Sequence, residues 1–390
     1  MRLLPASATA DARALLATRA LRGFADGLVS VFLASYLGKL GFSALEVGII
    51  VTSTLLGSAA LTLGIGLLGH RLRRRAVLLG AAALMFATGI GFAGLRGFWP
   101  ILLVAFVGTI NPSAGDVTLF LPTEQAVLSE SIAPRDRTLA FAWYNVLGSF
   151  AGALGALVAA IPPRAGFVLY AVVALIAAAI YRRLSPNAEV EVATATQPLA
   201  TSRSIVFRLA AIFCIDSFGG GFVVQALLAL WLSQRFGLSV EQAGAFFFVA
   251  GICNGASQFA SSRLAARIGH VRTMVFTHLP SNALLMLAGV MPTAPLAIAC
   301  LVLRSTMSSM DVPARQAYVM AMVPREERAA ASSVTNVPRA LASAISPVLA
   351  GALLERTSFG WPLIIGGALK SIYDLLIFAS FARLRPDESA

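Results

Sequence analysis

Long apolar stretches alternate with short polar loops along most of the chain. Many of these stretches contain about 20 residues, which is the length that an α-helix needs to cross a lipid bilayer. We therefore predict an all-α membrane protein with twelve transmembrane helices. The predicted spans are 20–40, 46–68, 76–95, 98–122, 138–161, 165–182, 207–234, 241–264, 273–292, 295–321, 329–353 and 361–382.

The longest polar interruption, residues 183–206, is rich in Pro, Thr, Ser and Glu and has no apolar period. Such a composition is typical of linkers. We predict that it connects an N-terminal six-helix half, residues 1–182, to a C-terminal six-helix half, residues 207–390.

The two predicted halves share a short sequence. The stretch that begins at Leu121 reads LPTEQA, and the stretch that begins at Val312 reads VPARQA. The same offset of 191 residues relates Asn145 to Asn336. This pattern indicates a duplication in which both halves run in the same direction, one of the two repeat plans of secondary transporters.

Ionisable residues line one face of the fourth and tenth predicted spans. At helical spacing this face carries Ser113, Asp116, Phe120 and Glu124 in the first copy, and Arg304, Met307, Asp311 and Arg315 in the second. Charged groups are costly in lipid and usually face a bundle interior or a water-filled path. We therefore expect both stripes to face the inside of the bundle.

The composition supports a membrane protein, because 58% of residues are hydrophobic and 12% are charged. The formal charge of +12 would suggest nucleic acid as a partner for a soluble protein. However, 21 of the 30 Lys and Arg residues fall at the chain ends and in the even-numbered loops, and five fall in the odd-numbered loops. This bias predicts cytoplasmic termini and excludes a nucleic-acid partner.

The three cysteines and three histidines share no metal-ligand spacing, and no nucleotide-binding loop of the GxxxxGK[ST] type occurs. No nucleophile lies beside a base in the pattern of a hydrolase. We therefore expect no metal, no cofactor and no enzymatic activity. The N-terminus lacks the pattern of a cleaved signal peptide, so the first span is expected to be retained.

The loop that follows the second span resembles the cytoplasmic signature of the major facilitator superfamily. The matching positions are Gly66, Arg71, Arg74 and Arg75. His70 stands where the family pattern has Asp, and Arg73 stands where it has Gly. The resemblance covers essentially the whole chain. It implies that spans one, four, seven and ten line a central cavity between the halves.

A glycine-rich stretch in the fifth span, residues 148–155, resembles the stretch that marks proton-coupled drug antiporters. Ala153 replaces the expected Pro, and Ala156 replaces the final Gly. The alternative is that these small residues only allow close helix packing. The resemblance therefore favours export by a narrow margin.

Asp26 and Asp216 lie at similar depths in the first and seventh spans, beside glycines. A carboxyl group in a partly dry site can exchange a proton under working conditions. We predict proton coupling through Asp26, Asp216 and Asp116. The alternative for Asp26 is a structural pair with Arg22 one helical turn away.

Arg304 lies near the middle of its span, where an unpaired guanidinium is prohibitively costly. Its predicted partner is an anionic ligand or one of four carboxylates, and these are Asp26, Asp116, Asp216 and Asp311. We predict a substrate site formed by Arg304, Asp26, Asp216, Asn145, Asn336, Phe218 and Phe222. In the last span, Lys370 is expected to pair with Asp374 at i, i+4.

Glu124 and Arg315 occupy equivalent positions with opposite charges. We predict that they form a gate with Asp311, in which Glu124 meets Arg315 when the cytoplasmic side closes. The alternative is local pairing, of Arg315 with Asp311 and of Glu124 with a loop arginine such as Arg135.

These features together predict a monomeric secondary transporter of the bacterial inner membrane. Its partners are the lipid bilayer, protons and a small-molecule substrate. The favoured activity is proton-coupled export of a small, partly apolar compound by alternating access. One alternative is uptake or exchange of a small anion held by Arg304. A more distant alternative is a membrane receptor that transports nothing.

Overall fold

The computed structural model describes residues 8–68, 72–113, 119–133, 136–189, 202–324 and 327–381. Within these ranges the regular structure is helical and no strand occurs, which confirms the all-α prediction. The helices of the first part are α1 (Ala10–Lys39), α2 (Ala44–Leu68), α3 (Arg74–Gly94), α4 (Phe98–Val107), α5 (Leu121–Glu130), α6 (Arg137–Leu157), α7 (Pro163–Tyr181) and the 3-10 helix η3 (Pro186–Glu189). Those of the second part are α8 (Arg203–Gly221), α9 (Gln225–Phe236), α10 (Val240–Ile268), α11 (His270–Val290), α12 (Ala294–Ser305), α13 (Asp311–Ala321), α14 (Arg328–Arg356) and α15 (Trp361–Phe381).

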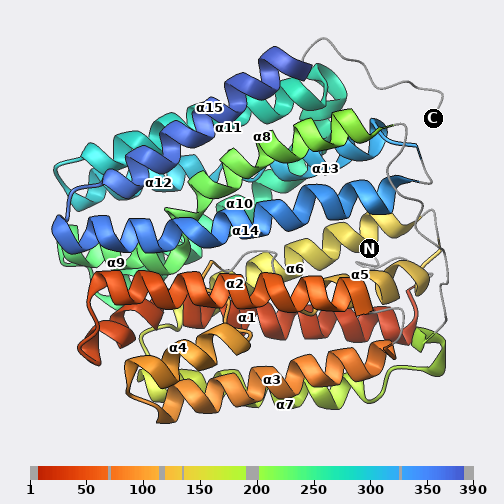
Figure 1. Ribbon diagram of the computed structural model, residues 1–390, viewed down its shortest axis with the longest axis horizontal. Coiled ribbons are helices and arrows are strands. Elements are labelled where there is room, and N and C mark those ends of the chain that lie inside the picture. The colour runs from red at the N-terminus through yellow and green to blue at the C-terminus, as the bar shows by residue number, and fades with distance from the viewer. Residues whose placement is uncertain are drawn as a thin grey trace.

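The helices run side by side along the long axis of the molecule, with α1–α7 on one side and α8–α15 on the other (Figure 1). We call these two groups the N-terminal and C-terminal halves. The first helix begins and the last helix ends at the same end of the bundle, on the right in Figure 1. We call it the termini end, and we call the opposite end the far end.

Nine helical segments in the described part of the chain are long and apolar enough to cross a membrane. The joined segment Arg203–Phe236 is one of them, and two shorter apolar helices are Phe98–Val107 and Ala294–Ser305. The multi-pass prediction agrees with these lengths. The count of twelve crossings and the cytoplasmic placement of the termini stay predictions.

The fourth predicted span, 98–122, is not one helix. Helix α4 ends at Val107, and α5 begins at Leu121. Near the start of the break, the Asn111 side chain accepts hydrogen bonds from the backbone N–H of Ser113 at 3.1 Å and from its hydroxyl at 2.8 Å. Pro112 has no N–H with which to continue a helix. The predicted stripe through Ser113 and Phe120 is therefore wrong as a helical face, and Asp116 lies outside the described residues.

The seventh and tenth predicted spans are interrupted too. The seventh divides into α8 and α9 around residues 222–224. The tenth divides into α12 and α13 around residues 306–310, so Arg304 and Met307 do not share a helix with Arg315. Asn254 on α10 accepts hydrogen bonds from the hydroxyls of Ser308 and Ser309 at 3.1 Å each. A neighbouring helix thus supplies partners for the second break.

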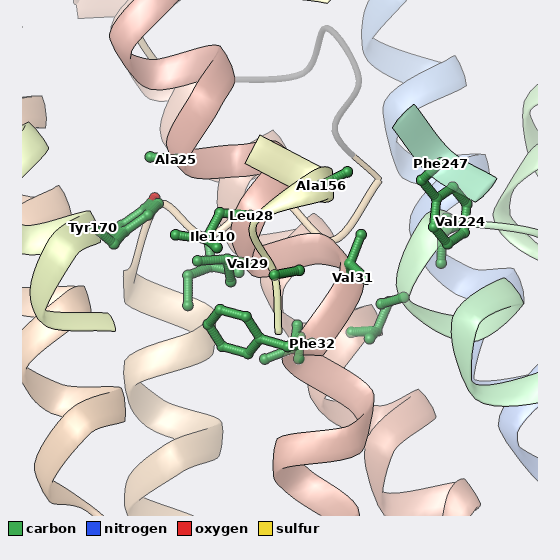
Figure 2. Close-up of a cluster of buried hydrophobic side chains, with 14 of the residues drawn as sticks. Ala25, Leu28, Val29, Val31, Phe32, Ile110, Ala156, Tyr170, Val224 and Phe247 are labelled. Carbon is green, nitrogen blue, oxygen red and sulfur yellow. The ribbon is translucent and has the colours of Figure 1, made fainter. Parts of the chain in front are cut away.

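The main hydrophobic core connects the two halves towards the far end. Figure 2 shows Val31 and Phe32 of α1 in the same cluster as Val224 and Phe247 of the C-terminal half. Two further clusters, around Phe213 and around Val206, contain residues of the C-terminal half alone. Apolar burial therefore joins the halves at the far end and in the middle of the bundle.

Polar contacts join the halves in the same region. The backbone N–H of Leu45 donates to the Glu355 carboxylate at 2.8 Å, and that of Val348 donates to the Thr52 hydroxyl at 3.0 Å. In the middle, the N–H of Ala226 at the start of α9 donates to the carbonyl of Pro112 at 3.0 Å. Two of the interrupted spans therefore meet at their breaks.

Glycines allow the closest helix contacts. A Cβ atom on Gly23 of α1 would lie 2.6 Å from the carbonyl oxygen of Gly148 on α6, and Gly27 faces Gly152 more closely still. Gly155 packs against the backbone at Phe24 in the same way. The glycine-rich stretch of the fifth span therefore serves helix packing, as the alternative interpretation expects.

Candidate functional site

A buried polar cluster in the N-terminal half is centred on Glu124 of α5, whose side chain is 0% exposed. The hydroxyls of Thr18 and Tyr181 donate to Oε1 at 2.9 and 2.5 Å. The guanidinium of Arg22 and the hydroxyl of Tyr144 bind Oε2. Four donors from α1, α6 and α7 thus bind one carboxylate. These hydrogen bonds and the ion pair replace the water that a buried charge has lost.

Arg22 is held on its other side by an aromatic ring. Its guanidinium carbon lies 4.2 Å from the centroid of Phe120, at the N-cap of α5. The neighbouring Arg19 lies 5.1 Å from the ring centroid of Tyr144. Cation–π contacts of this kind add to the ion pair where water is excluded.

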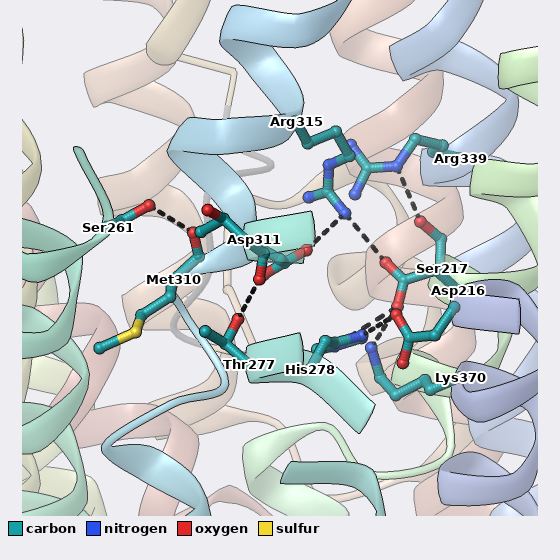
Figure 3. Close-up of polar contacts among 12 residues, drawn as sticks. Asp216, Ser217, Ser261, Thr277, His278, Met310, Asp311, Arg315, Arg339 and Lys370 are labelled. Atoms are coloured by element: carbon teal, nitrogen blue, oxygen red, sulfur yellow. Dashed lines mark hydrogen bonds and ion pairs between the residues drawn. The ribbon is translucent and has the colours of Figure 1, made fainter. Parts of the chain in front are cut away.

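The C-terminal half contains a second cluster, centred on Asp216 of α8 (Figure 3). Lys370 of α15 donates to Oδ1 at 2.5 Å, and Arg315 of α13 donates to Oδ2 at 3.1 Å. Arg315 also donates to Asp311 of its own helix at 3.0 Å. The local pairing of Arg315 with Asp311 matches the alternative interpretation of the sequence.

Further polar groups extend this cluster across three more side chains. The Nε2 atom of His278 on α11 lies 3.9 Å from Oδ1 of Asp216. Arg339 of α14 donates from Nε to the hydroxyl of Ser217 at 3.0 Å. Figure 3 shows these side chains converging on Asp216 and Ser217 from separate helices. Most helices of the C-terminal half therefore contribute to one network.

Asp374 has different partners from the one predicted. His278 Nδ1 lies 3.0 Å from its Oδ1, and the Asn282 amide donates to its Oδ2 at 2.8 Å. The expected i, i+4 pair with Lys370 does not form, because the ammonium group binds Asp216 instead. The Asp216 carboxylate on α8 thus lies closer to the Lys370 ammonium than the Asp374 carboxylate on the same helix does.

Both clusters join the first span of a half to the segment after a helix break, with the charges exchanged. In the N-terminal half a cation of the first span, Arg22, pairs with an anion that follows the break in the fourth, Glu124. In the C-terminal half an anion of α8, Asp216, pairs with a cation that follows the break in the tenth span, Arg315. Glu124 and Arg315 are equivalent positions of opposite charge. Asp216, however, matches Asp26 in depth rather than Arg22, so the two pairs are similar but not identical contacts.

Asp26 lies one turn along α1 from Arg22 but does not join the N-terminal cluster. Its side chain is 6% exposed. Among the described residues it accepts no hydrogen bond and forms no ion pair. The predicted structural pair with Arg22 is absent, because that guanidinium binds Glu124.

Arg304 at the end of α12 also has no counter-ion within the described part of the chain. Its Nε atom is buried without a hydrogen-bond partner. Asp26, Asp216 and Asp311 are therefore not its partners in this structure, and Asp116 lies outside the described residues.

The remaining predicted substrate-site residues have mixed environments. Asn145 on α6 is half-buried, whereas Asn336 on α14 is exposed and accepts a long hydrogen bond of 3.4 Å from Arg339. Phe218 and Phe222 pack edge-to-face at the end of α8, with ring centroids 5.5 Å apart. Phe218 and Phe222 contact each other, and a substrate site that they share with Asn145 and Asn336 stays a prediction.

Glu124 and Arg315 each have a full set of partners within their own half, and they do not contact each other here. The predicted gate requires both to exchange partners in another conformation. It therefore stays a prediction.

The loop that carries the family signature is anchored at the termini end. Arg74 forms an ion pair with Glu130 of α5, with 2.9 Å between Nη2 and Oε1. The backbone N–H of Arg75 donates to Glu189 of η3 at 3.1 Å, and its guanidinium binds the carbonyl of Leu184. Arg71 lies outside the described residues, and Gly66 lies in the last turns of α2.

Several members of the two clusters were not predicted as site residues from the sequence. They are Thr18, Tyr144, Tyr181, His278 and Asn282. Hydroxyl, imidazole and amide groups are common on packed helices, so their spacing alone carries no signal. A buried carboxylate on another helix gives them their role.

The long apolar helices with charges buried between them define a multi-pass membrane protein. The chain matches the family model described as Major Facilitator Superfamily over residues 15–279 and again over residues 209–390. It therefore belongs to the major facilitator superfamily, which is a family of transporters rather than enzymes. A relative from Saccharomyces cerevisiae, described as uncharacterized membrane protein YJR124C, is 25% identical over 426 residues, which are 96% of this chain and 94% of that protein.

Solved structures with the same fold cover almost the whole chain. A mutant of the nucleoside transporter NupG superposes with a TM-score of 0.77 at 14% identity, over 95% of this chain and 100% of that one. The human organic anion transporter MFSD10 gives 0.65 at 17% identity, over 94% and 99%. A bacterial homologue of the human lysosomal transporter Spinster, in an inward-facing and occupied conformation, gives 0.70 at 13% identity, over 94% and 95%. At these identities the likeness extends to the fold alone.

Proposed function

We propose that the protein is a proton-coupled secondary transporter that exports a small, partly apolar compound by alternating access between its two halves. The observation that carries the proposal is the buried Asp26 carboxylate, which has no hydrogen bond or ion pair among the described residues. Glu124 and Asp216, in contrast, are held by cations. A group without a fixed counter-ion can gain and lose a proton at lower cost than a paired one.

The excess of arginines at the termini end supports a cytoplasmic location for both chain ends. With that orientation, the contacts at the far end close the extracytoplasmic side, as alternating access requires of an inward-facing state. The proposed location of the protein in the bacterial inner membrane rests on composition alone, because only two of its 30 basic residues are lysines.

Replacement of Asp26 by Asn tests the proposal. A screen of organic cations, nucleosides and small organic anions, read by the thermal stability of the purified protein, first selects a ligand. Transport of that ligand into proteoliposomes is then measured with and without an imposed pH gradient. We expect Asp26→Asn to lose the response to the gradient while its expression and thermal stability remain unchanged. An undiminished response in the variant would exclude Asp26 as the coupling group.

A second candidate function is uptake or exchange of a small anion, and it rests on Arg304. The C-terminal half places three carboxylates and four cations in one region of the described structure, and these are Asp216, Asp311, Asp374, Arg304, Arg315, Arg339 and Lys370. When these seven groups are ionised, the four cations exceed the three carboxylates by one positive charge. An anionic substrate would neutralise it and supply a partner for the buried Nε atom.

The charge of Arg304 decides between the two candidates. If Arg304 binds an anionic substrate, organic anions should no longer raise the melting temperature of the Arg304→Ala variant, because a charge-assisted contact is lost. Retained stabilisation by the same anions, together with a lower melting temperature without ligand, would assign Arg304 a structural role.

A further inference from the structure

A cavity of about 350 Å³ lies at the far end, apart from both charge clusters. The last turns of α1 form one wall with Phe32, Ser35 and Lys39, and the segment that leads from α6 into the first residue of α7, residues 159–163, forms another. The start of α10, residues 239–241, closes the third side. The N-terminal half therefore supplies two walls, and the C-terminal half supplies one.

The walls carry opposite charges on opposite halves. Lys39 belongs to the N-terminal half and Glu241 to the C-terminal half, and both side chains are exposed. Among the described residues, neither the Lys39 ammonium nor the Glu241 carboxylate forms an ion pair or a side-chain hydrogen bond. The floor is apolar, because Phe32 and Ala159 line the cavity and are almost fully buried.

Exposed aromatic residues place this end at the level of lipid headgroups. Trp99, near the start of α4, is 75% exposed, and Trp361, at the start of α15, is 46% exposed. Tryptophan side chains concentrate where the hydrocarbon of a bilayer meets water. Lys39 is the last residue of α1 and Glu241 lies in the first turn of α10, and both line the cavity at this end.

We propose that this cavity binds the zwitterionic headgroup of an ethanolamine phospholipid, with the phosphate at Lys39 and the primary ammonium at Glu241. A glycerol headgroup offers no cation to Glu241, and a choline headgroup has no N–H to donate to its carboxylate. The apolar floor takes the glycerol end of the lipid. Because its two charged walls belong to different halves, the bound lipid holds the far end closed and stabilises the conformation seen here.

Native mass spectrometry of the purified full chain tests the binding, with phosphatidylethanolamine, phosphatidylcholine or phosphatidylglycerol added separately. We expect preferential retention of phosphatidylethanolamine. The single variants Lys39→Glu and Glu241→Lys should each weaken its retention about tenfold, the effect of one charge-assisted hydrogen bond. The double exchange, Lys39→Glu with Glu241→Lys, should restore it, because the cavity then again presents both signs.

Arg96→Glu is the matched control, since Arg96 is exposed at the same end and does not line the cavity. It should leave retention unchanged. Soluble glycerophosphoethanolamine carries the same headgroup without acyl chains. If the lipid stabilises the protein and this compound does not, the site binds a membrane lipid, as proposed. Equal retention of the three lipids, or full retention in both single variants, overturns the proposal.

The effect on conformation is measured by the distance between spin labels at Arg96→Cys and Arg356→Cys, two exposed far-end positions of opposite halves, after the native cysteines are replaced. Nanodiscs that contain phosphatidylethanolamine should show a larger closed fraction than nanodiscs of phosphatidylcholine. Equal fractions would remove the clamping role. This binding needs no proton coupling, so a negative result with Asp26→Asn leaves the lipid proposal intact.

Discussion

Glu124 illustrates how a buried charge is stabilised in this protein. The carboxylate has no exposed surface and receives hydrogen bonds from Arg22, Thr18, Tyr144 and Tyr181. A buried ion pair does not by itself prove a stabilising role, but removal of one member leaves the other charge unpaired. The partners of Glu124 therefore make it an anchor of the N-terminal half in this conformation.

Glu124→Gln should destabilise the protein by about 3–5 kcal/mol, because Arg22 loses its counter-charge inside the bundle. Tyr181→Phe removes one hydrogen bond to a charged group and should cost about 1.5–3 kcal/mol. The measurement is reversible unfolding in detergent. The double change Arg22→Met with Glu124→Met should recover most of the loss, since no unpaired charge remains. A double variant as unstable as Glu124→Gln would contradict this account.

Residue-scale predictions from the sequence succeeded where the partner lies on the same helix in the folded protein. The contact of Arg315 with Asp311, which was the alternative to the predicted gate, is such a case. The pairing of Lys370 with Asp374 was wrong, because Asp216 approaches Lys370 from α8 and His278 approaches Asp374 from α11. Spacing along one helix gives no information about carboxylates on neighbouring helices, so tertiary contacts decide.

At the scale of helices, apolar length predicted most elements well and predicted their continuity poorly. The break after α4 has a local signal in Asn111 and Pro112. The break between α12 and α13 contains neither Pro nor Gly. Its polar groups are satisfied by α10, where Asn254 binds Ser308 and Ser309 and the Ser261 hydroxyl donates to the carbonyl of Met310. A break that depends on another helix cannot be read from its own sequence.

Two glycines of α1 provide a matched test of helix packing. A Cβ atom on Gly27 would overlap the carbonyl of Gly152 on α6, whereas one on Gly38 would meet no atom within 4 Å. Gly27→Ala should therefore destabilise the protein by about 1–3 kcal/mol. Gly38→Ala should be neutral or stabilising by up to about 1 kcal/mol, because alanine favours the helix. Melting temperatures of the two purified variants give the comparison, and equal effects would argue against close packing of α1 on α6.

At the scale of the whole molecule, the contacts between the halves decide which conformation is populated. The inter-half hydrogen bonds of Thr52, Glu355 and Pro112 lie between the middle of the bundle and the far end. Belonging to the major facilitator superfamily was predictable from a loop motif and a repeat. The conformation was not, because both states of an alternating-access protein share one sequence and differ only in which contacts they make.

Thr52 and Thr54 lie two residues apart on α2 and allow a matched comparison. Thr52 makes a contact between the halves, and Thr54 makes a contact within its own helix. The Thr52 hydroxyl accepts a hydrogen bond from the N–H of Val348 on α14, whereas the Thr54 hydroxyl donates to the carbonyl of Ile50 in its own helix. Thr52→Val removes a contact that exists only while the far end is closed. A loss of about 1 kcal/mol from that state shifts the populations about fivefold towards a far-end-open state.

The spin labels at Arg96→Cys and Arg356→Cys report this shift as a larger fraction of long distances. Thr54→Val makes the same chemical change but removes a hydrogen bond that both conformations contain, so it should leave the distance distribution unchanged. Since a contact can move an equilibrium only by its difference between the two states, an equal shift in both variants would mean that Thr52 acts through the stability of α2 alone. A shift in Thr52→Val alone would identify the contact between Thr52 and Val348 as one that selects the far-end-closed state.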